Sequence, residues 1–200
     1  MNLTGITEFD EVLVKHFLDS LCCVKAVDMN NVKTVMDIGT GAGFPGVPLK
    51  IAFPEVEACL LDSLNKRVKF LEETFALLGL EGISAIHGRA EEYAKNKAYR
   101  EKYDLCVSRA VSGLATLSEY CLPYVKVGGL FVSYKSGSVK EEAEAAEKAV
   151  KILGGKIRDI QYFDLPGSEI GRSLVIIEKV KNTPGKYPRK AGTPLREPLA

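Results

Sequence analysis

The chain has 200 residues, of which 46% are hydrophobic and 26% charged, and this composition suits one globular domain with a sizeable core. No apolar stretch is long enough to span a bilayer and no signal peptide opens the chain, so we expect a cytoplasmic protein. The net charge is +1, which excludes a protein that is basic overall, but the last twenty residues are strongly basic. The five cysteines form no Cys-x-x-Cys pair, and His16 and His87 lie far apart, so we expect reduced cysteines and no metal site.

Strand-like and helix-like segments alternate along the chain, which predicts an α/β fold with a mostly parallel, seven-stranded sheet. The expected strands span residues 34–38, 56–61, 83–87, 103–108, 129–134, 156–163 and 173–180. The expected helices span residues 45–53, 64–78, 89–97, 113–123 and 138–153. Only about nine residues join the last two strands, too few for a crossover helix, so we expect a terminal antiparallel hairpin.

The most informative segment is the glycine-rich turn between the first expected strand and the first expected helix. Four glycines occur within residues 39–46, and glycine tolerates positive φ and lets a ligand approach the backbone closely. Pro45 suits the first position of the following helix, where its missing N–H is not needed. Turns of this kind at the carboxyl edge of a parallel sheet bind nucleotides or nucleoside-like cofactors.

Two cofactor classes compete for this turn. The spacing Gly41-x-Gly43-x-x-Gly46 fits the fingerprint of nicotinamide enzymes, which is a weak signal by itself. Asp37 directly precedes the glycines, and a carboxylate there disfavours a pyrophosphate and favours S-adenosylmethionine, which has an ammonium group and no phosphate. Asp62 ends the second strand and can bind the ribose hydroxyls of either cofactor. The terminal hairpin and the lack of room for a second substrate domain favour a class I methyltransferase.

We divide the chain into a methyltransferase domain at 1–180 and a tail at 181–200. The tail contains five basic residues and one acidic residue, so its net charge is +4 and that of the remainder is −3. Four prolines and two glycines in the tail predict irregular structure. A basic tail on a mildly acidic body is typical of a protein with a polyanion partner, although a solvated terminus explains the charge equally well.

Segments spread over the whole sequence carry a resemblance to a known family. They are Asn2-Leu3-Thr4, Lys15-His16, Asp19-Ser20-Leu21, the glycine turn with Val47-Pro48-Leu49, Asp62-Ser63, Lys66-Arg67, Gly88-Arg89-Ala90-Glu91, Ser108-Arg109-Ala110 and the octet 187–194. With these residues the chain resembles the ribosomal RNA small-subunit methyltransferase G family. The resemblance implies a Rossmann-like class I fold, S-adenosylmethionine as cofactor, and methylation of N7 of a guanine in 16S ribosomal RNA. It also implies a partner, either 16S ribosomal RNA or the small ribosomal subunit, and nothing in the sequence requires more than a monomer.

One departure from the family concerns the beginning of the chain. Family members usually carry further helical sequence before the Asn-Leu-Thr segment, whereas Met1 stands directly in front of it here. We therefore expect exposed apolar surface where those helices would pack.

The resemblance and the glycine turn together give the expected site residues. The expected cofactor contacts are Asp37, Gly39, Gly41, Phe44, Asp62, Ser63, Ala90, Glu91 and Arg109. Guanine N7 has an in-plane lone pair and no proton, so methyl transfer needs alignment of the reactants and no general base. We expect Arg109, which follows the fourth strand, to orient the methionine end of the cofactor or the guanine. The expected RNA phosphate contacts are Lys135, Arg172, Arg189 and Lys190.

Two alternative functions remain open at this point. One is a methyltransferase of the same fold that acts on a protein or a small molecule, against which the basic tail argues. The other is a nicotinamide-dependent oxidoreductase, which only the glycine spacing supports.

Overall fold

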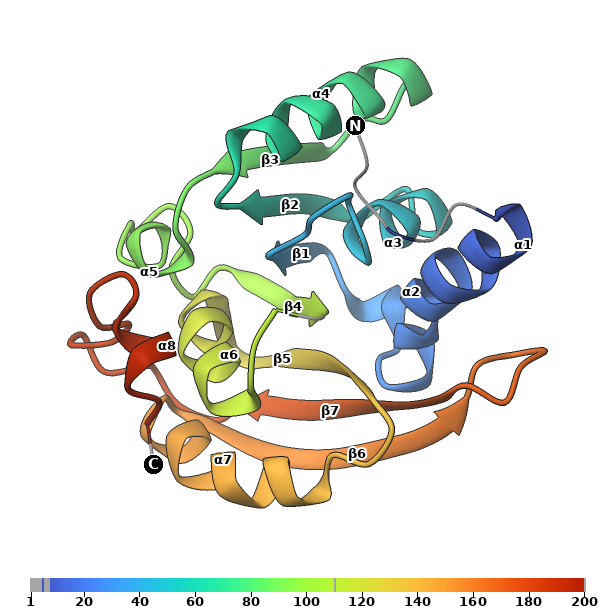
Figure 1. Ribbon diagram of the computed structural model, residues 1–200. Coiled ribbons are helices and arrows are strands. Elements are labelled where there is room, and N and C mark those ends of the chain that lie inside the picture. Colours follow the sequence, from blue (N-terminus) through green and yellow to red (C-terminus); the bar gives the residue numbers. More distant parts are fainter. Residues whose placement is uncertain (1–4, 6–7, 110, 200) are drawn as a thin grey trace.

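The computed structural model describes residues 5, 8–109 and 111–199, and it contains one seven-stranded sheet with helices on both faces (Figure 1). The strands are β1 (Thr34–Ile38), β2 (Glu57–Asp62), β3 (Ile83–His87), β4 (Tyr103–Arg109), β5 (Val125–Ser136), β6 (Gly155–Asp164) and β7 (Gly171–Lys179). The α-helices are α1 (Phe9–Val12), α2 (Asp19–Leu21), α3 (Gly46–Ala52), α4 (Asn65–Leu78), α5 (Ala90–Tyr93), α6 (Leu114–Cys121), α7 (Lys140–Ile152) and α8 (Thr193–Arg196). A π-helical segment, η1 (Leu13–Leu18), and the 3₁₀ helices η2 (Cys22–Lys25), η3 (Met29–Asn31) and η4 (Leu122–Tyr124) complete the described elements.

The strand order is β3-β2-β1-β4-β5-β7-β6. Strands β1 to β5 pair in parallel, whereas β7 pairs antiparallel with both β5 and β6. This confirms the predicted α/β fold class and the terminal antiparallel hairpin. Because β1 and β4 are neighbours while their following strands lie on opposite sides, the chain reverses its winding direction between them.

Alternation along the strands assigns each residue to one of two cores. Met36 and Ile38 point toward the face that α5, α6 and α7 cover, and they join the larger core cluster. Val35 points to the opposite face, where the segment 23–32 and α3 pack, and α4 covers the same face over β2 and β3. All five cysteines are buried and free, as expected of reduced core residues.

The predicted boundaries of several elements were wrong. The fifth strand was expected to begin at residue 129, but β5 begins at Val125 and continues through Gly128 and Gly129. The pairing of β4 with β5 shifts register between Tyr103 and Leu105, and a Cβ on Gly129 would lie 2.6 Å from the carbonyl oxygen of Asp104. Gly129 therefore permits a close approach of two strands inside the sheet, and Gly128 supplies a φ of +86° beside it.

Other differences concern helix ends and the two terminal regions. Helix α3 begins at Gly46, so Pro45 is its N-cap residue and not its first residue. The expected helix at 89–97 is limited to α5, and that at 113–123 ends as the 3₁₀ helix η4. The tail, expected to be irregular, contains the short helix α8, and the helical segments within 9–31 were not predicted at all.

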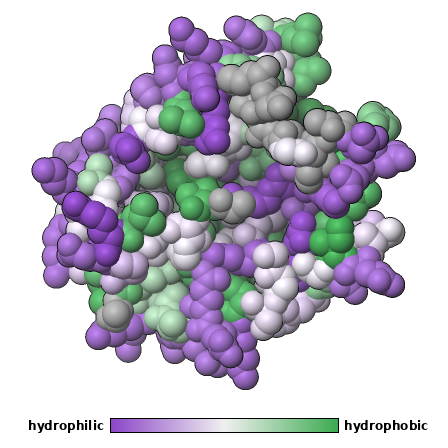
Figure 2. All heavy atoms as spheres, viewed as in Figure 1, coloured by the Kyte–Doolittle hydropathy of each residue, from purple (hydrophilic) through white to green (hydrophobic). Residues whose placement is uncertain are grey.

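The surface is mostly polar on the face that Figure 2 shows, with apolar residues in small groups between hydrophilic ones. In the N-terminal helical segments the side chains of Phe9, Leu13, Phe17 and Leu18 are exposed. None of the helices in the described parts of the chain is long and apolar enough to cross a membrane.

Candidate functional site: two adjoining cavities at the strand ends

The glycine turn lies at the carboxyl end of β1, at the point where the winding direction reverses. In open α/β sheets this point forms a crevice in which ligands bind. Gly39 has φ +72°, and a Cβ there would lie 2.6 Å from Cγ2 of Val111 in the loop after β4. Glycine at this position therefore lets the turns after β1 and β4 come into close contact.

Asp37 stabilises this turn from inside the protein. Its Oδ2 accepts hydrogen bonds from Oγ1 of Thr40 at 2.7 Å and from the backbone N–H of Gly46 at 2.9 Å. Its Oδ1 is buried without a hydrogen-bond partner among the described residues. Burial raises the pKa of Asp37 to about 6, and the bonds from Thr40 and Gly46 only partly oppose this effect.

A first cavity of about 330 Å³ opens beside the turn, which is within the usual size range of small-molecule sites. Its lining combines the ends of β1 and β2, the start of α5, the loop after β4, α6 and the tail. The lining residues are Ile38, Gly39, Leu61, Asp62, Ser63, Arg67, Gly88, Arg89, Ala90, Glu91, Val111, Ser112, Tyr120 and Leu195. The predicted cofactor residues Gly39, Asp62, Ser63, Ala90 and Glu91 meet here, whereas Asp37, Gly41, Phe44 and Arg109 are not part of the lining.

Asp62 is the best-placed carboxylate of this cavity. Its Oδ1 accepts from the N–H of Leu64, and its Oδ2 accepts from the N–H of Gly41 and, at 3.2 Å, from Nη1 of Arg67. An ionised carboxylate has about four lone-pair sites, so a site remains for a further donor such as a ribose hydroxyl. Gly41 therefore contributes to this site by fixing Asp62.

These residues fit S-adenosylmethionine. The cofactor combines an ammonium and a sulfonium group, two ribose hydroxyls and a flat adenine ring. The cavity offers carboxylates, apolar side chains and the aromatic ring of Tyr120, while the unpartnered Oδ1 of Asp37 lies behind the turn. Burial followed by the nearby charge of Glu91 raises the pKa of Tyr120 to about 12, so its hydroxyl remains protonated and can donate a hydrogen bond.

A second cavity of about 390 Å³ lies on the other side of the β4 end and is strongly basic. It is lined by Lys15, His16, Asp19, Arg109, Tyr134, Lys135, Ser136 and Arg172. It thus brings together Arg109, Lys135 and Arg172, which were predicted to orient the reactants or to bind RNA. Arg109 and Val111, only two positions apart in the chain, line different cavities, so the two cavities share the loop after β4.

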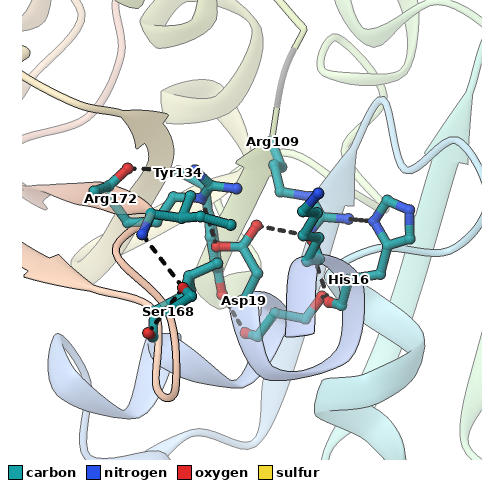
Figure 3. A network of polar contacts seen from close by, with 11 residues as sticks. His16, Asp19, Arg109, Tyr134, Ser168 and Arg172 are labelled. Atoms are coloured by element: carbon teal, nitrogen blue, oxygen red, sulfur yellow. Dashed lines mark hydrogen bonds and ion pairs between the residues drawn. The ribbon is translucent and has the colours of Figure 1, made fainter. Parts of the chain in front are cut away.

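Asp19 lies between the two arginines of this cavity (Figure 3). Its Oδ2 pairs with Nη1 of Arg109 at 2.9 Å and its Oδ1 pairs with Nε of Arg172 at 3.1 Å. Asp19 itself is 3% exposed, so it holds both guanidinium groups from the protein interior while they face the cavity. Four basic side chains, those of Lys15, Arg109, Lys135 and Arg172, line the cavity with the single carboxylate of Asp19, so the cavity favours an anionic ligand.

Aromatic and cationic groups cluster beside Arg109. The ring of Phe44 stacks on that of His16 with centroids 4.9 Å apart, and the guanidinium carbon of Arg109 lies 5.3 Å from the centre of the same Phe44 ring. Burial and the positive charge of Arg109 lower the pKa of His16, which favours its neutral form. Phe44 thus contacts two residues that line the second cavity, and it is not part of the lining of the first.

Lys135 connects the two cavities. Its Nζ donates to the carbonyl of Ser112 at 2.9 Å, and Ser112 lines the first cavity. The same Nζ pairs with Oε1 of Glu142 at 2.7 Å. Lys135 therefore fixes the loop after β4 in addition to lining the second cavity.

The two predicted RNA contacts in the tail differ in their surroundings. Arg189 forms a bidentate ion pair with Glu119 of α6, with Nε donating at 3.0 Å and Nη2 donating at 2.7 Å. Glu119 is fully buried, so this pair binds the tail to the domain. Lys190 is exposed, and its contact with RNA stays a prediction.

Sequence reasoning missed several contributors to the two cavities, among them Asp19, His16, Tyr120 and Leu195. Asp19 and His16 come from the unpredicted N-terminal helices, while Tyr120 and Leu195 come from α6 and α8. The only available signal was an acid next to an apolar run, Asp19 before Leu21-Cys22-Cys23, together with the resemblance of that segment to the family. Among the residues that the structure describes, no three His, Cys, Asp or Glu side chains are grouped so that they could hold a metal ion.

Comparison with known proteins identifies the family. Residues 1–170 match the family described as rRNA small subunit methyltransferase G. A ribosomal RNA small subunit methyltransferase G from Lachnoclostridium phytofermentans is 55% identical over 199 residues, which covers 100% of this chain and 82% of that relative. The chain belongs to the rRNA small subunit methyltransferase G family.

Solved structures agree with this assignment at the level of the fold. The methyltransferase segment "StiE O-MT residues 961-1257" superposes with a TM-score of 0.64 at 16% identity, covering 84% of this chain and 75% of that one. "PigF with SAH" superposes with a TM-score of 0.59 at 16% identity, covering 80% of this chain and 61% of that one. The protein is therefore a Rossmann-like class I methyltransferase with S-adenosylmethionine as cofactor, and the nicotinamide alternative is excluded.

Proposed function

We propose that this protein transfers a methyl group from S-adenosylmethionine, bound in the first cavity, to N7 of a guanine of 16S ribosomal RNA that enters the second cavity. The single observation that carries this proposal is the adjacency of the two cavities at the loop after β4, within a chain of this family. In the first cavity Asp62 and Glu91 balance Arg67 and Arg89, so no excess of positive charge opposes the cationic cofactor. The basic second cavity next to it suits a nucleotide with its phosphates. The whole-family description as an rRNA methyltransferase favours RNA over a protein or small-molecule substrate.

In this proposal the first cavity positions the cofactor. Asp62 accepts hydrogen bonds from the ribose, the backbone at Gly39 contacts the methionine end, and Ser63, Ala90 and Glu91 flank the adenine. Asp37 acts through the turn, because its side chain is fully buried behind Gly39. When bound, the cofactor supplies a methyl group on a sulfonium that is already a good leaving group.

The second cavity positions the guanine. N7 attacks through its own lone pair, so no residue has to remove a proton, and alignment supplies the acceleration. Arg109 is held by Asp19, lies over Phe44 and has its Nη2 3.5 Å from Nδ1 of His16, so its guanidinium group is fixed in the wall of the cavity that the guanine would enter. We assign to Arg109 the orientation of the guanine, and to Lys135 and Arg172 contacts with the flanking phosphates. Sequence-specific RNA recognition favours such unstacked loop bases.

We further propose that the protein acts as a monomer in the cytoplasm on RNA of the small subunit. Its substrate is either free 16S ribosomal RNA or the assembled subunit. Parallel assays on the two substrates, each lacking the modification, distinguish these cases by their methylation rates.

The decisive experiment tests the acceptor atom. The purified chain is incubated with radiolabelled S-adenosylmethionine and a small-subunit RNA transcript, and with the same transcript in which 7-deazaguanosine replaces guanosine. Replacing N7 by a C–H group removes the lone pair without changing the Watson–Crick edge. We expect label only in the guanosine transcript, whereas equal labelling of both transcripts would exclude N7. A parallel titration with S-adenosylhomocysteine checks that the cofactor pocket is functional.

A further inference from the structure

The tail contributes one apolar wall of the first cavity. Leu195, in α8, lines this cavity opposite the ends of β1 and β2, and it is still 61% exposed. Figure 1 shows α8 beside α6, with the preceding part of the tail next to α5. An exposed leucine on a four-residue helix costs hydration free energy unless a ligand or partner covers it.

The tail is fixed at this place by the buried polar side chains of Glu91 and Thr116, which bond the residues just before Leu195. Upstream, the N–H of Gly192 donates to Oε1 of Glu91 at 2.8 Å, and Glu91 also lines the cavity. Directly before Leu195, the carbonyl of Pro194 accepts from Oγ1 of Thr116 at 3.0 Å. These contacts tie the tail to α5 and α6, the two helices that flank the cavity.

Arg189 links the tail to α6 and also bonds a residue that follows Leu195. Its guanidinium pairs with the buried Glu119, and its Nη2 also donates to the carbonyl of Glu197 at 2.7 Å. One side chain thus joins α6 to the residues before and after α8. Farther back, Arg100 donates to the carbonyls of Thr183 and Tyr187 and holds the start of the tail.

We propose that residues 187–197 form a strap that completes the cofactor pocket, and that Leu195 contacts bound S-adenosylmethionine while Arg189 positions the strap. The inference rests on the proposed assignment of the first cavity to the cofactor. A strap held in place before the ligand arrives reduces the ordering cost of binding. The basic tail thereby gains a role in cofactor binding that is separate from contact with RNA.

The test measures the affinity of the full chain for S-adenosylhomocysteine by calorimetry. Leu195→Ala is expected to weaken binding about threefold to tenfold, because the ligand loses apolar contact area. Leu77→Ala, a matched change at an exposed leucine of α4, is expected to leave the affinity unchanged. Arg189→Gln is expected to weaken binding as well, whereas Arg196→Gln, the same loss of charge at an exposed tail position, is not.

A pocket variant separates failure of the strap from failure of the cavity assignment. Asp62→Asn is expected to weaken binding strongly. If Asp62→Asn weakens binding and Leu195→Ala does not, the strap is refuted while the cavity assignment stands. If Asp62→Asn has no effect on the affinity, the assignment of the first cavity to the cofactor is wrong, and the proposed role of the strap is refuted as well.

A second measurement does not depend on whether Arg189→Gln folds. Trypsin cleaves after Lys186, Arg189 and Lys190 when the tail detaches, so the rate of tail loss reports how often the strap opens. A saturating concentration of S-adenosylhomocysteine is expected to slow tail loss at least tenfold in the unaltered chain and clearly less in Leu195→Ala. An equal rate with and without the ligand in the unaltered chain would overturn the proposal.

Discussion

Asp37 gives the sharpest quantitative prediction, because its carboxyl group is fully buried and one of its oxygens has no partner among the described residues. Burial raises its pKa from 3.8 to about 6 in the folded chain. Between these two values the folded state binds the proton more tightly than the unfolded state does. Ionisation of Asp37 therefore lowers the free energy of unfolding as the pH rises through this window.

The size of the effect follows from linkage. A difference of about two pKa units corresponds to about 3 kcal/mol in full. Between pH 5 and pH 7.5 the free energy of unfolding should fall by about 1 kcal/mol through Asp37 alone. Asp37→Asn removes this contribution and retains the shape and an acceptor for the bonds from Thr40 and Gly46.

The assay is urea unfolding of the unaltered chain and of Asp37→Asn at both pH values. All other titrating groups are common to the two proteins, so the difference between them isolates Asp37. Between pH 5 and pH 7.5 we expect the free energy of unfolding of Asp37→Asn to rise by about 1 kcal/mol relative to that of the unaltered chain. Curves that remain parallel over this range would refute the reasoning. Saturation with S-adenosylhomocysteine, whose ammonium group favours the ionised carboxyl, should flatten the pH dependence of the unaltered chain.

Three further predictions concern single basic residues. Arg109→Ala should reduce turnover about tenfold to a hundredfold, because a charged hydrogen bond to the substrate is lost, while the affinity for S-adenosylhomocysteine stays within about twofold. The control is Arg158→Ala, at an exposed position of β6, and unchanged turnover of Arg109→Ala would contradict the role of Arg109. Lys190→Ala should reduce the slope of RNA affinity against salt, on logarithmic axes, by about 0.7 to 0.9, measured against Lys156→Ala, and an unaltered slope would exclude a phosphate contact. Burial lowers the pKa of Lys179 to about 8, so the unfolded state binds its proton more tightly and stability rises with pH above 8. Between pH 7.5 and pH 9.5 this contribution is about 2 kcal/mol, and Lys179→Met should abolish it in urea unfolding at the two pH values.

The sequence alone determined the parts of this protein that depend on neighbouring residues. Strand β1 has the predicted bounds, because an apolar run followed by glycines is typical of a buried strand that ends in a turn. Helix α4 ends at Leu78, as predicted, and Gly79 caps it in a left-handed conformation. The glycine turn with Asp37 and Asp62 pointed to the nucleoside-like cofactor for the same reason, since turn chemistry and strand ends are local features.

Only the tertiary structure decided which distant residues meet. Asp19 fixes Arg109 and Arg172, which lie 90 and 153 positions away in the chain. Arg189 was predicted to contact an RNA phosphate, and the structure pairs its guanidinium group with Glu119, which lies 70 positions away and is buried. The physical reason is that a buried charge requires an opposite charge and good geometry, and the fold alone determines which one is within reach. Composition and periodicity describe each segment, whereas the contents of the two cavities depend on which segments the sheet order places side by side.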